Sequence, residues 1–163
     1  MAERDYVVDA SVAGRWFVNY PPHVEESRRV QADADQGRIA VIAPENLLHE
    51  LTGVIDRAVF SRRLSARQGR EQLERFMARA MTWFETNDLV LPAWDLSIRD
   101  GCSDYDAIYL EIARRYNSWF IHADGNLRRA LNGRFPFEVW IEDYGEVKLG
   151  IDRARNRFRI ICR

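Results

Sequence analysis

The 163-residue chain has little cysteine, no long apolar run and no strong charge of either sign. A formal net charge of −1 excludes a uniformly basic coat for nucleic acid, although local basic patches could still bind phosphate. Cys102 and Cys162 form no C-x-x-C motif and are too few for a disulfide framework, which favours a reducing compartment. No stretch approaches the ~18 apolar residues of a membrane span, and the start lacks the pattern of a signal peptide. We therefore expect a cytoplasmic protein with no membrane partner.

Lysine is also nearly absent, since Lys148 is the only lysine among 24 basic residues. Arginine can bind phosphate through two parallel hydrogen bonds, but a preference of the source genome explains arginines spread over the whole chain more simply. The densest basic stretch is a candidate RNA-binding surface, with an ordinary solvated helix face as the alternative. It comprises Arg62, Arg63, Arg67 and Arg70.

Short apolar runs alternate with amphipathic stretches along the chain. Residues 6–9, 39–42 and 119–124 read as buried strands, and residues 25–36 as an exposed helix between the first two. With 47% hydrophobic residues, the chain suits one domain that buries roughly 70% of its unfolded surface. This order predicts an α/β fold with a central, mostly parallel sheet.

Further elements follow from capping residues and helical spacing. Ser11 is expected to cap a short helix. Pro44 is expected to end the second strand and suits the first turn of the helix that follows. That second helix carries Leu47, Leu48, Leu51, Val54, Ile55, Ala58 and Val59 on one apolar stripe. The next is expected to carry Leu73, Phe76, Met77, Ala80 and Phe84. We also expect a strand over 89–91, helices over 103–116 and around 127–131, and an edge strand over 139–144.

The last eighteen residues have a different pattern, because apolar residues alternate on both sides of a turn near 152–156. This predicts a C-terminal β-hairpin over 146–163 that extends a domain over 1–145. Four arginines share one face of the hairpin, where they would block unwanted strand pairing or, alternatively, contact RNA. They are Arg153, Arg155, Arg157 and Arg159.

Four acidic residues are candidates for one shared site. Asp9 and Asp124 each follow a predicted strand, and the rim beyond the carboxyl ends of parallel strands is where such sheets place their chemistry. Asp106 lies in the first turn of the helix over 103–116, and Glu50 borders an apolar stripe one turn after Asn46. Clustered carboxylates repel one another and imply a hard divalent cation.

Each acid also has a purely structural explanation. Ser103 and Asp106 have capping-box spacing, Asp9 and Asp124 suit turns, and Glu50 could be a solvated helix position. Asp104 suits a helix N-terminus better than a ligand set. One shared site explains all four acids more simply than four coincidences.

In order and spacing, these motifs resemble the PIN-domain ribonucleases, and most closely the VapC-type toxins of VapBC toxin–antitoxin pairs. The motifs are V-V-D-A-S at 7–11, N-x-x-x-E at 46–50, S-D-Y-D-A-I-Y-L-E-I-A at 103–113 and H-A-D at 122–124. The resemblance spans residues 6–144 and implies a PIN-like three-layer α/β/α fold.

The resemblance also implies a site and an activity. Asp9, Glu50, Asp106 and Asp124 would be the catalytic and metal-binding residues, with Ser11, Asn46, Asp104 and His122 in support. His122 stands where the family usually has Thr or Ser, which leaves open the choice between Mg²⁺ and Mn²⁺ because imidazole suits Mn²⁺ better. The implied reaction is endonucleolytic hydrolysis of single-stranded or looped RNA, leaving 5′-phosphate and 3′-hydroxyl ends.

A VapC-type toxin would bind a small antitoxin, and the apolar helices over 47–84 could also support a homodimer. Two alternatives stay open. One is a housekeeping PIN-type nuclease of RNA maturation, and the other is a catalytically silent RNA- or protein-binding PIN module. A receiver-type phosphorylation domain is disfavoured, because Lys148 lies in the predicted terminal hairpin.

Overall fold

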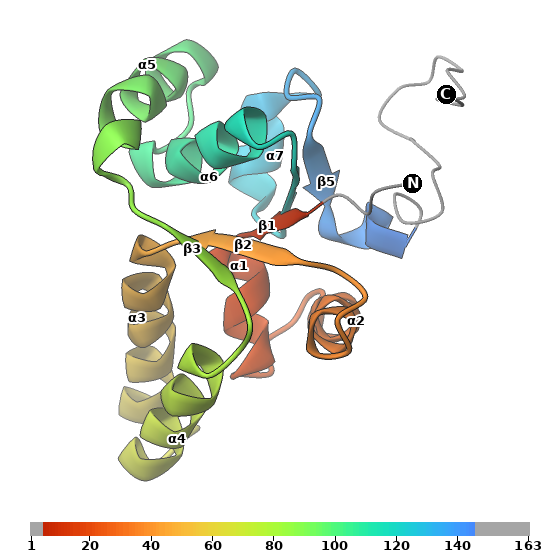
Figure 1. Cartoon of the computed structure of the whole chain (residues 1–163). Helices are drawn as coiled ribbons and strands as arrows, with labels where there is room; N and C mark the ends of the chain where they lie inside the picture. The colour runs from red at the N-terminus through yellow and green to blue at the C-terminus, as the bar shows by residue number, and fades with distance from the viewer. Residues whose placement is uncertain (1–4, 146–163) are drawn as a thin grey trace.

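A computed structural model describes residues 5–145, which form a single five-stranded sheet (Figure 1). Every strand pairing in it is parallel, and the strand order is β3-β2-β1-β4-β5. The strands are β1 (Tyr6–Val8), β2 (Val41–Pro44), β3 (Thr82–Phe84), β4 (Trp119–His122) and β5 (Glu138–Trp140). The predicted α/β fold with a central parallel sheet is confirmed.

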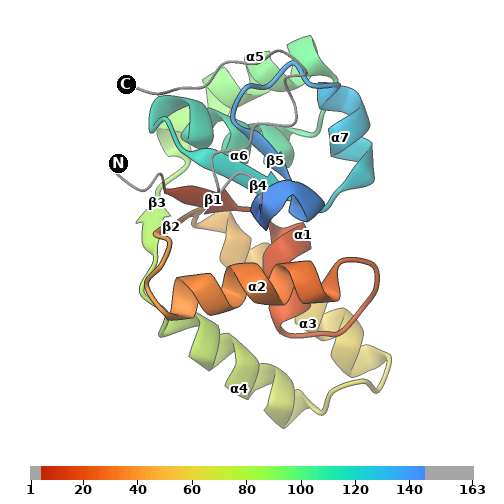
Figure 2. The same cartoon turned by 90° about the vertical axis from the view of Figure 1, so that its right-hand side faces the viewer.

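Helices cover both faces of the sheet, with α5, α6 and α7 on one side and α1, α2, α3 and α4 on the other (Figures 1 and 2). Their bounds are α1 (Ala10–Ala13), α2 (Val24–Asp35), α3 (Asn46–Phe60), α4 (Ala66–Met77), α5 (Val90–Asp100), α6 (Asp104–Arg115) and α7 (Gly125–Leu131). Three short 3-10 helices complete the described chain: η1 (Gly14–Trp16), η2 (Asn87–Leu89) and η3 (Ile141–Asp143). The three-layer α/β/α arrangement matches the prediction.

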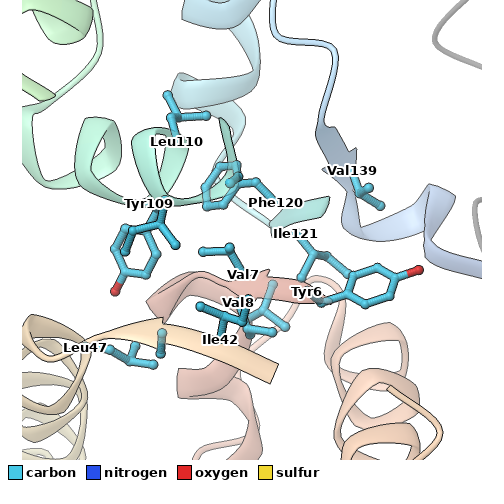
Figure 3. Close-up of a cluster of buried hydrophobic side chains, with 14 of the residues drawn as sticks. Tyr6, Val7, Val8, Ile42, Leu47, Tyr109, Leu110, Phe120, Ile121 and Val139 are labelled. Atoms are coloured by element: carbon cyan, nitrogen blue, oxygen red, sulfur yellow. The ribbon is translucent and has the colours of Figure 1, made fainter. Parts of the chain in front are cut away.

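The core lies on both sides of the central strand β1 (Figure 3). Val7 and Val8 are fully buried, since β1 has a neighbouring strand on each side and helices over each face. Phe120 on β4 and Tyr109 on α6 fill the space between the sheet and α6 (Figure 3). Burying side chains of this size stabilises the folded chain by roughly 1.5–3 kcal/mol each. This packing holds β1 in place, and with it the position where the strand ends.

Ser11 does not cap α1 as predicted, and Pro44 ends the second strand as predicted but does not enter the helix that follows. Asp9, and not Ser11, caps α1, because its carboxylate accepts a hydrogen bond from the Ser11 backbone N–H at 2.8 Å. Pro44 is the last residue of β2 and pairs with Phe84, so α3 begins at Asn46. A proline is tolerated at such a strand end, where one fewer ladder hydrogen bond is needed.

Residues 78–100 differ most from the sequence-based expectation. The helix predicted through Phe84 ends at Met77, and Thr82–Phe84 forms β3 against β2. The strand predicted over 89–91 is wrong, since these residues lead into α5, with Pro92 in its first turn. Val90 and Leu91 are 55% and 75% exposed, so their apolar run does not mark a buried strand.

At the C-terminal end, the predicted edge strand over 139–144 is shorter, because β5 stops at Trp140 and η3 follows. The predicted hairpin over 146–163, with its four arginines, lies outside the described residues. Within residues 5–145, no helix is both long and apolar enough to cross a bilayer.

Candidate active site

The turns after β1 and β4 are joined at the carboxyl edge of the sheet. Val8 and Ile121 are paired in register, and the Asp9 backbone N–H donates to the Ile121 carbonyl at 3.1 Å. One step further, the Ser11 hydroxyl accepts a hydrogen bond from the Ala123 N–H at 2.9 Å. These bonds bring the backbone of Asp9 next to the turn that leads into Asp124.

Asp9 is only 5% exposed, although it is an acid. Burial raises the pKa of its carboxyl, and the nearby charge of Asp124 raises it further. Hydrogen bonds from Ser11 and the proximity of His122 act in the opposite direction. A buried acid with a raised pKa is typical of functional sites.

Asp124 and Asp106 each lie at the start of a helix. Asp124 caps α7, and its Oδ1 accepts hydrogen bonds from the N–H groups of Asn126 at 2.7 Å and Leu127 at 3.2 Å. Ser103 caps α6 as its spacing predicts, because its hydroxyl accepts from the Asp106 N–H at 3.0 Å and donates to Asp106 Oδ2 at 2.7 Å. Burial raises the pKa of Asp106, and the charges of Asp9 and Asp124 add to that rise.

Glu50 projects from the second turn of α3. Its Oε1 accepts hydrogen bonds from Asn46 Nδ2 and from the Tyr109 hydroxyl, both at 2.8 Å. Burial raises the pKa of Glu50 to about 7, with further contributions from the charges of Asp9 and Asp106. Glu50 is therefore close to half ionised at neutral pH.

These mutual effects place the four acids within electrostatic reach of one another. Three of them, Glu50, Asp106 and Asp124, line a cavity of about 530 Å³ that the α5–α6 connection and α7 also border. Asp9 does not line it, but its charge acts on both Glu50 and Asp106. Four separate segments thus supply carboxylates to one region at the carboxyl edge of the sheet.

The chemistry of these donors suits a divalent cation. Carboxylate oxygens are ligands that Mg²⁺ and Mn²⁺ prefer, and a cation would relieve the repulsion among the four negative charges. The Asn46 Oδ1 atom is buried and has no hydrogen-bond partner among the described residues, which leaves a further hard oxygen here. Among residues 5–145, however, no three Asp, Glu, His or Cys side chains lie close enough to hold an ion together. Joint binding would therefore require at least some of these carboxylates to turn toward a shared position.

Residues 6–131, which include all four acids, match the PIN domain. This chain belongs to the PIN domain family. Members of the family are generally nucleases that act on RNA and use divalent metals. A crystal structure of PAE2754 from Pyrobaculum aerophilum is similar to this chain, with a TM-score of 0.62 over 90% of each chain. At 14% sequence identity, that likeness shows the fold alone. No curated protein is significantly similar to the chain.

Two residues that were predicted to support the four acids, His122 and Asp104, have different surroundings. His122 is fully buried, and its Nδ1 accepts from the Asp124 N–H at 3.3 Å while its Nε2 lies 3.0 Å from Glu138 Oε1. Both ring nitrogens are thus engaged within the protein, and His122 holds the Asp124 backbone. Asp104 is exposed and does not line the cavity, as expected for a charge at a helix N-terminus.

Tyr109 is the site residue that the sequence reasoning missed. It is buried on α6 and reaches Glu50, which lies 59 positions away in the sequence. The available signal was its spacing, because a residue three positions after Asp106 shares the same face of the helix.

The candidate RNA-binding arginines lie away from these acids. Arg62 and Arg63 follow the end of α3 at Phe60, which lies about 15 Å along the helix from Glu50 at 1.5 Å per residue. Arg67 and Arg70 on α4 form ion pairs with Glu71 and Glu74. Contact of this stretch with RNA stays a prediction, and it would require a substrate that extends along α3.

Proposed function

We propose that this PIN domain is a divalent metal-dependent endoribonuclease that hydrolyses phosphodiester bonds in single-stranded or looped RNA. The observation that carries the proposal is that Glu50, Asp106 and Asp124 line one cavity beside the buried Asp9, and that the pKa values of Asp9, Glu50 and Asp106 are all raised there. Acids that served only as turn or cap residues would have no reason to gather at one edge of the sheet beside a cavity. Strongly perturbed acids beside a cavity are instead typical of catalytic sites.

The four carboxylates would hold Mg²⁺ or Mn²⁺, which when bound polarises a phosphodiester and lowers the pKa of water. Burial raises the pKa of Glu50 to about 7, and no described residue donates a hydrogen bond to its Oε2. That oxygen is therefore available to bind the ion. Ser11 and His122 keep the two turns in place through the N–H groups of Ala123 and Asp124.

The acidic cavity repels phosphate groups, so RNA needs favourable contacts other than with its phosphates. Tyr105 lines the cavity and is 56% exposed, which suits stacking against an unpaired base. Such a base is available only in single-stranded or looped RNA. Products with 5′-phosphate and 3′-hydroxyl ends follow from the resemblance to PIN ribonucleases.

We further propose that the protein is the toxin of a VapBC-type pair, acting in the cytoplasm and inhibited by a small antitoxin. The support is the motif resemblance together with large apolar side chains that are exposed, a feature of interaction surfaces. Four of them, Val90, Leu91, Trp94 and Ile98, share one face of α5. The same surface could form a homodimer. A neighbouring reading frame for a small antitoxin that restores growth on co-expression would support this role, and its absence would favour a housekeeping nuclease.

Cleavage of a fluorescent single-stranded RNA by purified protein tests the enzymatic proposal. We expect cleavage with Mg²⁺ or Mn²⁺, none with EDTA, and none by Asp9→Asn. The matched control is Asp95→Asn, which removes an exposed aspartate on α5 and should cleave normally. Mn²⁺ binding that Asp9→Asn abolishes, without any cleavage by the unmodified protein, would instead indicate a silent binding module.

A further inference from the structure

Tyr109 is a buried tyrosine whose hydroxyl has a specific partner. Its side chain lies between α6 and the sheet, with its ring 6.0 Å from that of Phe120 (Figure 3). The hydroxyl donates to Glu50 Oε1 at 2.8 Å. A buried tyrosine hydroxyl requires such a partner, but packing alone would be served equally well by phenylalanine. The hydroxyl is therefore the part of Tyr109 that needs a functional explanation.

Glu50 Oε1 receives a second hydrogen bond from its own helix, α3, in addition to the one from Tyr109 on α6. Asn46 Nδ2 on α3 donates to it at 2.8 Å, while no described residue donates to Oε2. Two donors on one oxygen restrict how the carboxylate can turn, and they leave its other oxygen available to a ligand from outside.

The same contact connects two of the acids. Asp106 precedes Tyr109 by three positions, so both side chains lie on one face of α6. Through Tyr109, the helix that carries Asp106 also sets the position of Glu50. Asn46 Oδ1 is meanwhile buried without a partner among the described residues, which points to a donor or cation that the protein itself does not supply.

We propose that Tyr109 is a positioning residue for the divalent cation, and that with Asn46 it holds Glu50 so that Oε2 is available to the ion. This inference rests on the proposed function. It concerns the orientation of Glu50, since Tyr109 itself contacts neither the ion nor the RNA.

Mn²⁺ binding, measured by calorimetry without RNA, tests the role directly. Tyr109→Phe should bind Mn²⁺ about 10–100-fold more weakly, which is the usual effect of removing a group that orients a ligand. The matched control is Tyr116→Phe, which loses the same hydroxyl from a half-exposed tyrosine at the end of α6. The control should bind Mn²⁺ as tightly as the unmodified protein.

A second pair of variants separates orientation from a general disturbance of the fold. In a Glu50→Gln background, Tyr109→Phe should cause no further loss of Mn²⁺ affinity, because the carboxylate it orients is gone. An equal loss in both backgrounds would overturn the inference. If Tyr109→Phe does not fold, Asn46→Ala tests the same carboxylate from α3, and unchanged Mn²⁺ affinity in that variant would overturn it.

Asp9→Asn distinguishes this inference from the proposed function. If Asp9→Asn binds Mn²⁺ as well as the unmodified protein does, the carboxylate site itself is refuted, and the inference fails with it. If Asp9→Asn loses Mn²⁺ binding while Tyr109→Phe keeps it, only the role of Tyr109 is refuted.

Discussion

Glu50→Gln is expected to stabilise the ion-free protein at alkaline pH. The substitution removes a charge that burial and two neighbouring acids disfavour. Glutamine still offers an oxygen to Asn46 and Tyr109, so both hydrogen bonds can persist. If a residue serves the chemistry of a site and not the fold, replacing it can increase the stability of the protein.

The direction with pH follows from proton binding. Folding raises the pKa of Glu50 from the ordinary 4.5 to about 7, so the folded protein binds more protons than the unfolded chain between these values. The free energy of unfolding therefore falls as pH rises through this window, and the loss is complete above about pH 7. The rise corresponds to roughly 3 kcal/mol at about 1.4 kcal/mol per tenfold change in proton affinity. Because the carboxyl is partly exposed, solvent screening reduces this to about 1–2 kcal/mol.

Urea unfolding at pH 8 and pH 4.5, with EDTA present, measures the effect. Glu50→Gln should exceed the unmodified protein by about 1–2 kcal/mol at pH 8, and the difference should nearly vanish at pH 4.5. Glu85→Gln, at an exposed position after β3, should stay within about 0.5 kcal/mol at both pH values. An equal or lower stability of Glu50→Gln at pH 8, or a difference independent of pH, would refute the reasoning.

Three further predictions concern the ion, the RNA and the joined turns. Mn²⁺ at a hundred times its dissociation constant should stabilise the protein by about 2.7 kcal/mol, raising Tm by roughly 5–10 °C in a thermal scan, whereas Asp9→Asn should show no rise. Tyr105→Ala should raise the KM for single-stranded RNA about tenfold or more through lost stacking, while Trp94→Ala, which removes a side chain of equal 56% exposure, should not. Ser11→Ala should cost about 1–3 kcal/mol in urea unfolding, because the Ala123 N–H loses its partner, and equal stability would contradict this.

The parts of the fold that local pattern determines were predictable. The apolar run of β1 fixes where Asp9 lies, and Ser103 ends one segment and caps α6 as its spacing indicates. The start of α5 was mistaken for a strand because Val90 and Leu91 are apolar yet exposed. An apolar run of this length does not show by itself whether its side chains are buried, because that depends on the tertiary structure.

The candidate site divides in the same way. The acids could be proposed from their places after strands and at helix starts, because parallel strands end at a common edge. The bond between Tyr109 and Glu50 could not, since it joins residues on two helices that only the folded chain brings together. For His122, the sequence showed proximity to Asp124 but not the Glu138 carboxylate that engages its second ring nitrogen.

The central claim is that Asp9, Glu50, Asp106 and Asp124 together bind one or more divalent cations. Anomalous diffraction from a crystal soaked in Mn²⁺ tests it most directly. The claim predicts an anomalous peak in contact with carboxylate oxygens of these residues, with Glu50 contributing Oε2. Well-ordered acids without a peak, or a peak only at other residues, would contradict it.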